Sequence, residues 1–133
     1  MKLFSLLLLI ISLAFLNCSI HTQPVFVPLV YYADIDGYVV ISEDSYINEY
    51  LFFYGGIIYI SYPGVTKYDM VGDERVSGNK SYYYYSFKDL ELDYDVQDVT
   101  LRFYAFDEYD DEILYKTITV TIDEGSNHID IPL

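Results

Sequence analysis

Two neighbouring segments of the chain alternate apolar and polar residues with a period of two, and this pattern constrains the fold more than any other feature. Between residues 99 and 106 the apolar residues stand at every second position: Val99, Leu101, Phe103 and Ala105. Between residues 113 and 122, Ile118, Val120 and Ile122 alternate with threonines. A period of two places alternate side chains on opposite faces of a β-strand. The two segments therefore predict strands with one face in a hydrophobic core.

An acidic connection of six residues joins these two predicted strands. Its acidic residues are Asp107, Glu108, Asp110, Asp111 and Glu112. Charged groups are costly to bury without partners, so this connection must lie in solvent. The sequence therefore predicts a β-hairpin with a solvated tip at 107–112.

Further segments rich in Val, Ile, Tyr and Phe predict strands, because these residues favour extended backbone. They are Val25–Ala33, Tyr38–Ser42, Tyr50–Tyr54, Ile57–Tyr62, Tyr82–Phe87 and His128–Ile131. Gly55-Gly56 predicts a hairpin turn, although Glu43–Tyr54 also fits a short turn of helix. Residues 64–81 are rich in charge and predict a long connection. About seven to eight strands bury their apolar faces best in two packed sheets, so the predicted fold is all-β, a single antiparallel β-sandwich.

One short motif resembles a known family of β-sandwich domains. Tyr85-Ser86-Phe87-Lys88-Asp89-Leu90 resembles the Tyr-x-Phe-x-x-Leu strand and turn of transthyretin-like domains, whose architecture is broadly immunoglobulin-like. The glycine that usually follows the leucine in that family is absent, since Glu91-Leu92-Asp93 comes next. The resemblance covers six residues and implies the sandwich architecture alone.

The N-terminal residues have the layout of a secretory signal peptide. A single basic residue, Lys2, precedes an apolar stretch from Leu6 to Leu16. This stretch is shorter than the roughly 20 residues that a transmembrane helix needs. The predicted organisation is a signal peptide at 1–18, a short tether at 19–24 and a β-sandwich domain at 25–133. An uncleaved anchor and a buried helix are the alternatives.

The apolar stretch ends at Cys18, the only cysteine in the sequence. The residues Leu13-Ala14-Phe15-Leu16-Asn17-Cys18 resemble the cleavage region of bacterial lipoproteins, in the relaxed form that spirochaetes tolerate. The usual pattern is broken at Phe15 and Asn17. The resemblance implies that Cys18 becomes the N-terminus and carries acyl chains such as palmitate, which anchor the protein to a membrane. A lone thiol in an oxidising compartment also favours modification or removal, so cleavage after Ser19, giving a secreted protein, is the alternative.

The chain is strongly acidic, with 21 acidic residues against seven basic ones and a formal net charge of −14. Such a surface repels the phosphates of nucleic acids and of anionic lipid headgroups. We therefore expect no nucleic-acid partner and contact with a membrane only through the lipid anchor. The charge favours cationic partners or metal cations.

Residues 32–43 align with a twelve-residue calcium loop of the EF-hand type. Asp34 and Asp36 fall at the third and fifth places, Gly37 at the sixth and Glu43 at the twelfth. The first place lacks its usual aspartate, and the proline-containing segment before it cannot form the required helix. The preferred interpretation is a β-hairpin turn at Asp34–Gly37, with a calcium loop as the alternative.

A second group of candidate calcium ligands lies in the acidic tip, at Asp107, Asp110 and Asp111. Carboxylate oxygens are the ligands that calcium prefers, although a solvated loop has the same composition. We expect no cofactor, with calcium as the alternative.

Four consecutive tyrosines, Tyr82, Tyr83, Tyr84 and Tyr85, are the third candidate site. On a strand two of these rings face the core and two face outward. Exposed tyrosines offer a large contact area with a polar group, which suits protein or glycan recognition. The alternative is that the outer rings pack against neighbouring strands.

Patterns typical of enzymes are missing from the sequence. The two histidines, His21 and His128, lie near opposite ends of the chain, so neither a zinc site nor a catalytic triad can be assembled from them. We therefore predict a non-enzymatic, exported, lipid-anchored protein of the bacterial cell envelope, which binds a protein or glycan or has a structural role. A calcium-binding module is the second hypothesis and a small secreted hydrolase with a carboxylate pair is the third. The oligomeric state is left open.

Overall fold

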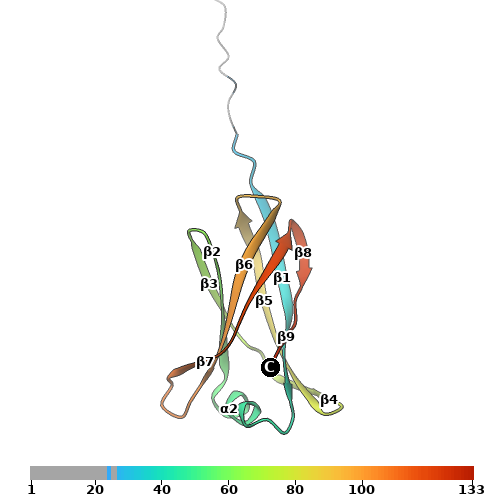
Figure 1. Cartoon of the computed structure of the whole chain (residues 1–133), viewed down its shortest axis with the longest axis vertical. Helices are drawn as coiled ribbons and strands as arrows, with labels where there is room; N and C mark the ends of the chain where they lie inside the picture. The colour runs from blue at the N-terminus through green and yellow to red at the C-terminus, as the bar shows by residue number, and fades with distance from the viewer. Residues whose placement is uncertain (1–23, 25–26) are drawn as a thin grey trace, which may run out of the picture.

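The computed structural model describes Pro24 and residues 27–133. This part of the chain forms nine β-strands and one short helix, α2. The strands make two packed sheets, so the predicted all-β sandwich is confirmed (Figure 1). The predicted signal peptide with Cys18 lies outside the described residues, as does the predicted tether apart from Pro24.

The five-stranded sheet is organised around β1. Its order is β4-β5-β1-β8, and β9 also pairs with β1. Strands β1 (Tyr31–Ser42) and β5 (Lys80–Leu92) are antiparallel, and β4 (Glu74–Ser77) pairs with β5. Strands β8 (Gly125–His128) and β9 (Ile131–Pro132) both run parallel to β1. The C-terminal segment thus completes the sheet that the first strand begins.

The four-stranded sheet is antiparallel throughout, in the order β3-β2-β6-β7. Its strands are β2 (Gly56–Tyr62), β3 (Val65–Met70), β6 (Val96–Phe106) and β7 (Glu112–Asp123). Strands β6 and β7 form the hairpin predicted from their alternation. Their acidic tip is largely exposed, as predicted.

The alternating residues of both sheets build the core. The buried apolar side chains contributed by β1 and β6 are Ala33, Ile35, Val39, Ile41, Val99, Leu101, Phe103 and Ala105. Ile118 and Val120 of β7 are only partly buried, because β7 forms an edge of its sheet. The period of two in the sequence therefore corresponds to inward and outward faces of real strands.

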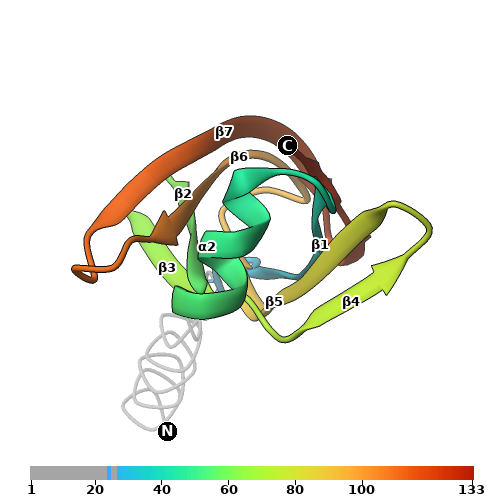
Figure 2. The same cartoon turned by 90° about the horizontal axis from the view of Figure 1, so that it is seen from below.

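Helix α2 (Tyr46–Tyr54) lies across one end of the sandwich, between β1 and β2 in the chain (Figure 2). Strand β1 begins at the opposite end, where the described chain enters the domain (Figure 1). Among the described residues, no helix has the length and apolar character needed to cross a membrane.

The predicted turn at Asp34–Gly37 is wrong, because β1 runs through it as one strand. Ile35 and Gly37 continue the buried face of this strand, so the alternation is unbroken. The predicted strands Val25–Ala33 and Tyr38–Ser42 are therefore parts of a single element, which begins at Tyr31.

The predicted strand Tyr50–Tyr54 is also wrong, and the alternative of a short helix is the one observed. Gly55 has a φ of 82° and donates its N–H to the carbonyl oxygen of Leu51 at 3.0 Å, which ends the helix. A Cβ atom on Gly56 would lie 2.6 Å from the Leu51 side chain. The glycine pair thus ends a helix and permits close packing, instead of forming a hairpin turn.

The predicted long connection at 64–81 contains two strands, β3 and β4. Both lie at sheet edges and most of their residues are exposed, so they lack the apolar alternation that marks a strand in sequence. The predicted strand His128–Ile131 is divided into β8 and β9, with residues 129 and 130 between them.

Candidate functional site

Exposed aromatic side chains gather at one end of the sandwich. We call this end the α2 pole and define it as α2 with the loops 43–45, 71–73 and 107–111 (Figure 2). Phe52 and Phe53 are 64% and 65% exposed, and their rings meet edge to face at a centroid distance of 5.3 Å. Tyr46 is 66% exposed. Aromatic rings of this size usually gain stability by burial, so an exposed group of them indicates a contact surface.

The amphipathic pattern of α2 explains why these rings point outward. Leu51 is buried, and Ile47 and Tyr50 pack partly against the core. Residues three and four positions apart share one helix face, so this face is directed at the sandwich. Phe52 and Phe53 fall outside it. A helix of nine residues is unstable alone, and its packing on the sandwich determines the position of the exposed rings.

A polar network also fixes α2 to the five-stranded sheet. The hydroxyl of Tyr83 donates to Oδ1 of Asn48 at 2.7 Å, and Nδ2 of Asn48 donates to Oε1 of Glu74 at 3.0 Å. The same Glu74 oxygen accepts from the hydroxyl of Ser81. Burial raises the pKa of Tyr83, with Glu74 adding to the effect, so this phenol stays protonated as a donor. The network therefore links α2, β4 and β5.

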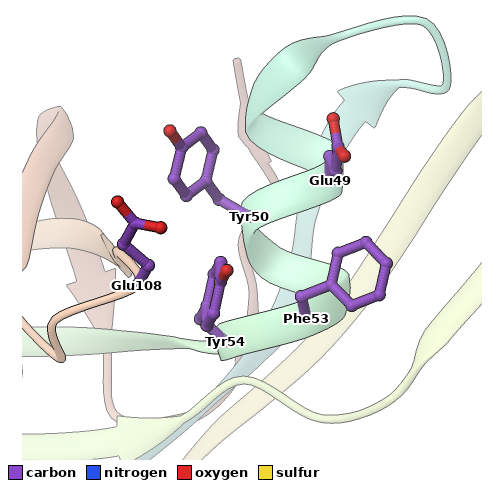
Figure 3. A pocket seen from close by; sticks show the side chains of 5 residues that line it. All are labelled: Glu49, Tyr50, Phe53, Tyr54 and Glu108. Carbon is purple, nitrogen blue, oxygen red and sulfur yellow. The ribbon is translucent and has the colours of Figure 1, made fainter.

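Three pockets surround α2. The first has a volume of about 210 Å³ and is lined by Glu49, Tyr50, Phe53, Tyr54 and Glu108 (Figure 3). The rings of Tyr50 and Tyr54 lie 6.0 Å apart between centroids, inclined by 42°. In Figure 3 both rings project on the side of the helix that faces Glu108. This pocket therefore combines aromatic walls with carboxylates from two elements.

The other two pockets continue the same surface along the helix. The second, of about 400 Å³, lies between Phe52 of α2 and the segment 71–74. The third, of about 430 Å³, extends from the loop after β1 to Phe52, Phe53 and Glu74. The Phe52 and Phe53 rings thus form a ridge among three pockets.

The charge of these pockets is uniformly negative. Their acidic lining residues are Glu43, Asp44, Glu49, Asp73, Glu74 and Glu108. No Lys, Arg or His lines any of the three, and none of the ion pairs in the described part of the chain involves these carboxylates. The α2 pole therefore offers apolar rings surrounded by negative charge.

The tyrosine run alternates across β5 as predicted. Tyr83 and Tyr85 are buried, while Tyr84 is 44% exposed on the outer face. Tyr82 and Tyr84 meet the ring of Tyr38 edge to face, with centroid distances of 5.9 and 5.6 Å. The outer rings thus pack on a neighbouring strand and keep part of their surface in solvent. Ligand binding by these tyrosines stays a prediction.

The structure does not bring the predicted EF-hand ligands together. Oδ1 of Asp34 accepts the backbone N–H of Asp89 at 2.9 Å, and this bond, with Lys88 nearby, lowers the pKa of Asp34. Asp36 lies beside His128, and Glu43 follows the far end of β1. An extended strand cannot wrap these oxygens around one ion, so the EF-hand loop geometry is wrong.

The acidic tip uses one carboxylate for turn geometry. Oδ1 of Asp107 accepts the backbone N–H of Tyr109 at 2.8 Å and that of Asp111 at 3.0 Å. Asp110 has a φ of 64°, and its side chain and that of Asp111 face solvent. Within the described residues no group of three or more His, Cys, Asp or Glu is arranged to hold a metal ion. Calcium binding stays an alternative, for which the described residues provide no preformed group of ligands.

The histidine His128 connects the C-terminal segment to β1. Its Nδ1 lies 2.6 Å from Asp36, and its Nε2 lies 3.2 Å from Asp130. The hydrogen bond to Asp36 raises the pKa of His128 above its ordinary value of 6.5, and Asp130 adds to this. Oδ1 of Asp130 also accepts the backbone N–H of Tyr38 at 2.9 Å. These contacts attach β8 and the following residues to the sheet.

Sequence reasoning missed the α2 pole, although the residues contained a signal. The run Phe52-Phe53-Tyr54 places three aromatic rings in succession, and a helix that packs one face on a core leaves part of such a run outside that face. If this segment forms a helix, at least one ring is therefore exposed. Which of them it would be depended on the helix.

Comparison with solved structures finds the crystal structure of a fimbrial assembly protein from Parabacteroides distasonis, with a TM-score of 0.56. The two sequences are 10% identical, and the match covers 78% of this chain and 53% of the other. This chain therefore spans about half the length of that protein. No protein-family model matches the chain, and no curated protein matches it in sequence. The likeness shows that the two proteins share a sandwich fold.

Proposed function

We propose that this protein is exported, anchored to the bacterial envelope by a lipid on Cys18, and binds a protein partner at the α2 pole without catalysing a reaction. The observation that carries the binding role is the exposure of Tyr46, Phe52 and Phe53 on one short helix. Aromatic side chains anchor protein interfaces because each removes a large apolar area from water on contact.

The position of α2 in the fold supports this role. The first strand begins at the end of the sandwich opposite α2 (Figure 1). A lipid on Cys18 precedes this strand in the chain, so the proposed anchor joins the domain at the end away from α2. The α2 pole then points toward partners outside the membrane.

The lining of the pockets suits contact with a partner, because it combines aromatic rings with carboxylates. The three pockets at the α2 pole contain no His, Cys or Lys, so the hydrolase alternative would have to use their carboxylates. The shared sandwich fold of a fimbrial assembly protein agrees with a role at the cell surface.

A site-specific photo-cross-linker tests the binding role in producing cells. Placed at Phe53, it should form a covalent adduct with an envelope protein. The matched control is Tyr94, which is 68% exposed in the loop between β5 and β6 at the opposite end of the domain. Adducts from neither position, or equal adducts from both, would remove the α2 pole from the proposal.

Mass spectrometry of the native N-terminus tests the anchor separately. A diacylated or triacylated Cys18 is the expected result. A mature chain that begins after Cys18, without acyl groups, would replace the anchored protein with a secreted one.

A further inference from the structure

The α2 pole combines two chemical properties that together specify its partner. Phe52 and Phe53 supply exposed apolar rings, and six carboxylates line the pockets around them. Resting on the proposed binding role, we infer that the partner presents a basic segment, in which arginine or lysine residues flank apolar ones.

The first pocket has the composition of a site for one cationic side chain. Its Tyr50 and Tyr54 rings offer π faces to a cation, and Glu49 and Glu108 supply two carboxylates (Figure 3). A guanidinium stacks on an aromatic ring and forms hydrogen bonds to a carboxylate through the same planar group. The volume of about 210 Å³ is below the ~300–1,000 Å³ of common small-molecule sites. It therefore suits a single inserted side chain.

The arrangement of the three pockets requires apolar residues between the basic ones. Phe53 lines the first and third pockets, while Phe52 lines the second and third. A partner segment that crosses this ridge contacts the Phe52 and Phe53 rings at the ridge and carboxylates on either side. In such a segment, apolar residues can pack on the rings while basic residues next to them pair with the carboxylates.

Charge also disfavours a second copy of the chain and anionic ligands at this surface. A second copy of the chain, docked through the same face, would bring the same six carboxylates against one another. Anionic glycans and lipid phosphates are repelled for the same reason. Glu74 accepts hydrogen bonds from Asn48 and Ser81, whereas Glu49 and Glu108 have no ion-pair partner in the described part of the chain.

Binding of a synthetic peptide tests the inference. The probe contains alternating arginine and leucine, and its control replaces every arginine with citrulline, which keeps the shape and removes the charge. The full acylated chain is held in phosphatidylcholine nanodiscs, and empty nanodiscs supply the background. We expect fluorescence anisotropy to show binding of the arginine peptide, weakening with added salt, and little binding of the citrulline peptide.

Paired variants separate a site from general attraction to an acidic protein. Replacing both acids of the first pocket, Glu49→Gln with Glu108→Gln, should weaken binding about fivefold or more. The control is the double variant Glu91→Gln with Asp93→Asn. These two acids line a pocket at the opposite end of the domain that, like the first pocket, contains a tyrosine, Tyr62. These acids are exposed, so the control keeps the fold and should change binding less than about twofold. Equal weakening by both pairs would overturn the inference.

The apolar part has its own pair of variants. Phe52→Ser should weaken peptide binding about tenfold, because a central aromatic anchor is lost. Tyr94→Ser removes an equally exposed ring at the other end and should leave binding unchanged. Unchanged binding of Phe52→Ser would overturn the role of the ridge.

The cross-linked adducts distinguish failure of this inference from failure of the proposed function. Sequencing of the adduct formed at Phe53 should identify a segment with Lys or Arg next to apolar residues. An adduct on a neutral or acidic segment, or on a glycan, contradicts the basic partner and keeps the binding role. The lack of any adduct at the α2 pole contradicts both.

Discussion

Gly37 lies in the middle of β1, where the carbonyl group of Ile129 passes directly over it. A Cβ atom at this position would be 1.8 Å from the Ile129 oxygen and 2.6 Å from its carbon. Both atoms belong to the backbone, so no side-chain rotation can relieve the overlap. Gly37→Ala is therefore expected to displace the C-terminal segment from β1.

The energetic effect follows from what this segment contributes. Ile131 is 1% exposed, and its burial is worth about 1.5–3 kcal/mol. The hydroxyl of buried Tyr85 donates to the Ile129 oxygen at 2.6 Å, and a buried donor left without an acceptor costs about 1–3 kcal/mol. Backbone bonds from Ile129 to Asp36 and from Leu133 to Val40 are also lost. We expect Gly37→Ala to lower the free energy of unfolding by about 4 kcal/mol, a large part of the ~5–15 kcal/mol of a typical domain.

Urea unfolding followed by tyrosine fluorescence measures this loss, since the chain has 17 tyrosines and no tryptophan. Gly72→Ala is the matched control, because its nearest neighbour, the carbonyl oxygen of Tyr84, would be 3.5 Å from the added Cβ. Hydrogen exchange at the amides of Ile129 and Leu133 should accelerate in Gly37→Ala. If Gly37→Ala lowers the free energy of unfolding by less than about 1 kcal/mol and both amides stay protected, the packing of this segment against Gly37 of β1 is refuted.

Three further predictions concern α2, the C-terminal segment and calcium. Asn48→Ala removes the closer acceptor of the buried Tyr83 hydroxyl, leaving it the Asn48 carbonyl oxygen at 3.4 Å, and also removes the amide donor to Glu74. It should lower the free energy of unfolding by about 1–2 kcal/mol, measured in urea, and an unchanged midpoint would contradict the network. The pKa of His128 is raised on folding, so the stability it adds is complete below pH 6.5 and is lost as pH rises through the folded pKa. As pH rises through this range, the melting temperature of the wild type should therefore fall more steeply than that of His128→Gln. Parallel pH profiles would show that the contact between His128 and Asp36 is not the source of this pH-dependent stability. Calcium at millimolar concentration should leave the melting temperature unchanged, because the candidate carboxylates do not converge on one point; a rise would restore a calcium site.

Local patterns determined the fold class and several of its details. The alternation at 99–106 and 113–122 predicted the hairpin of β6 and β7, because the inward positions of a half-buried strand must be apolar whatever the strand pairs with. The same rule predicted that two of the four tyrosines at 82–85 face the core, and the structure shows that these are Tyr83 and Tyr85. Export and the acyl group on Cys18 remain predictions from the sequence.

The tertiary structure decided those features in which residues distant in sequence meet. Gly37 resembled a turn residue because a glycine in sequence carries no sign of what crosses it, and here the crossing segment lies far along the chain at Ile129. Strands β3 and β4 were hidden because edge strands bury too little to need alternation.

The α2 pole shows the same division between local and tertiary information. A helix that packs one face on a core leaves at least one ring of the run Phe52-Phe53-Tyr54 exposed. The tertiary structure decided which rings were exposed, through packing of Leu51 on the core and the hydrogen bonds of Asn48. It also brought Glu108 from a distant loop to the Tyr50 and Tyr54 rings, a proximity that depends on the pairing of β2, which follows α2, with β6, which precedes this loop.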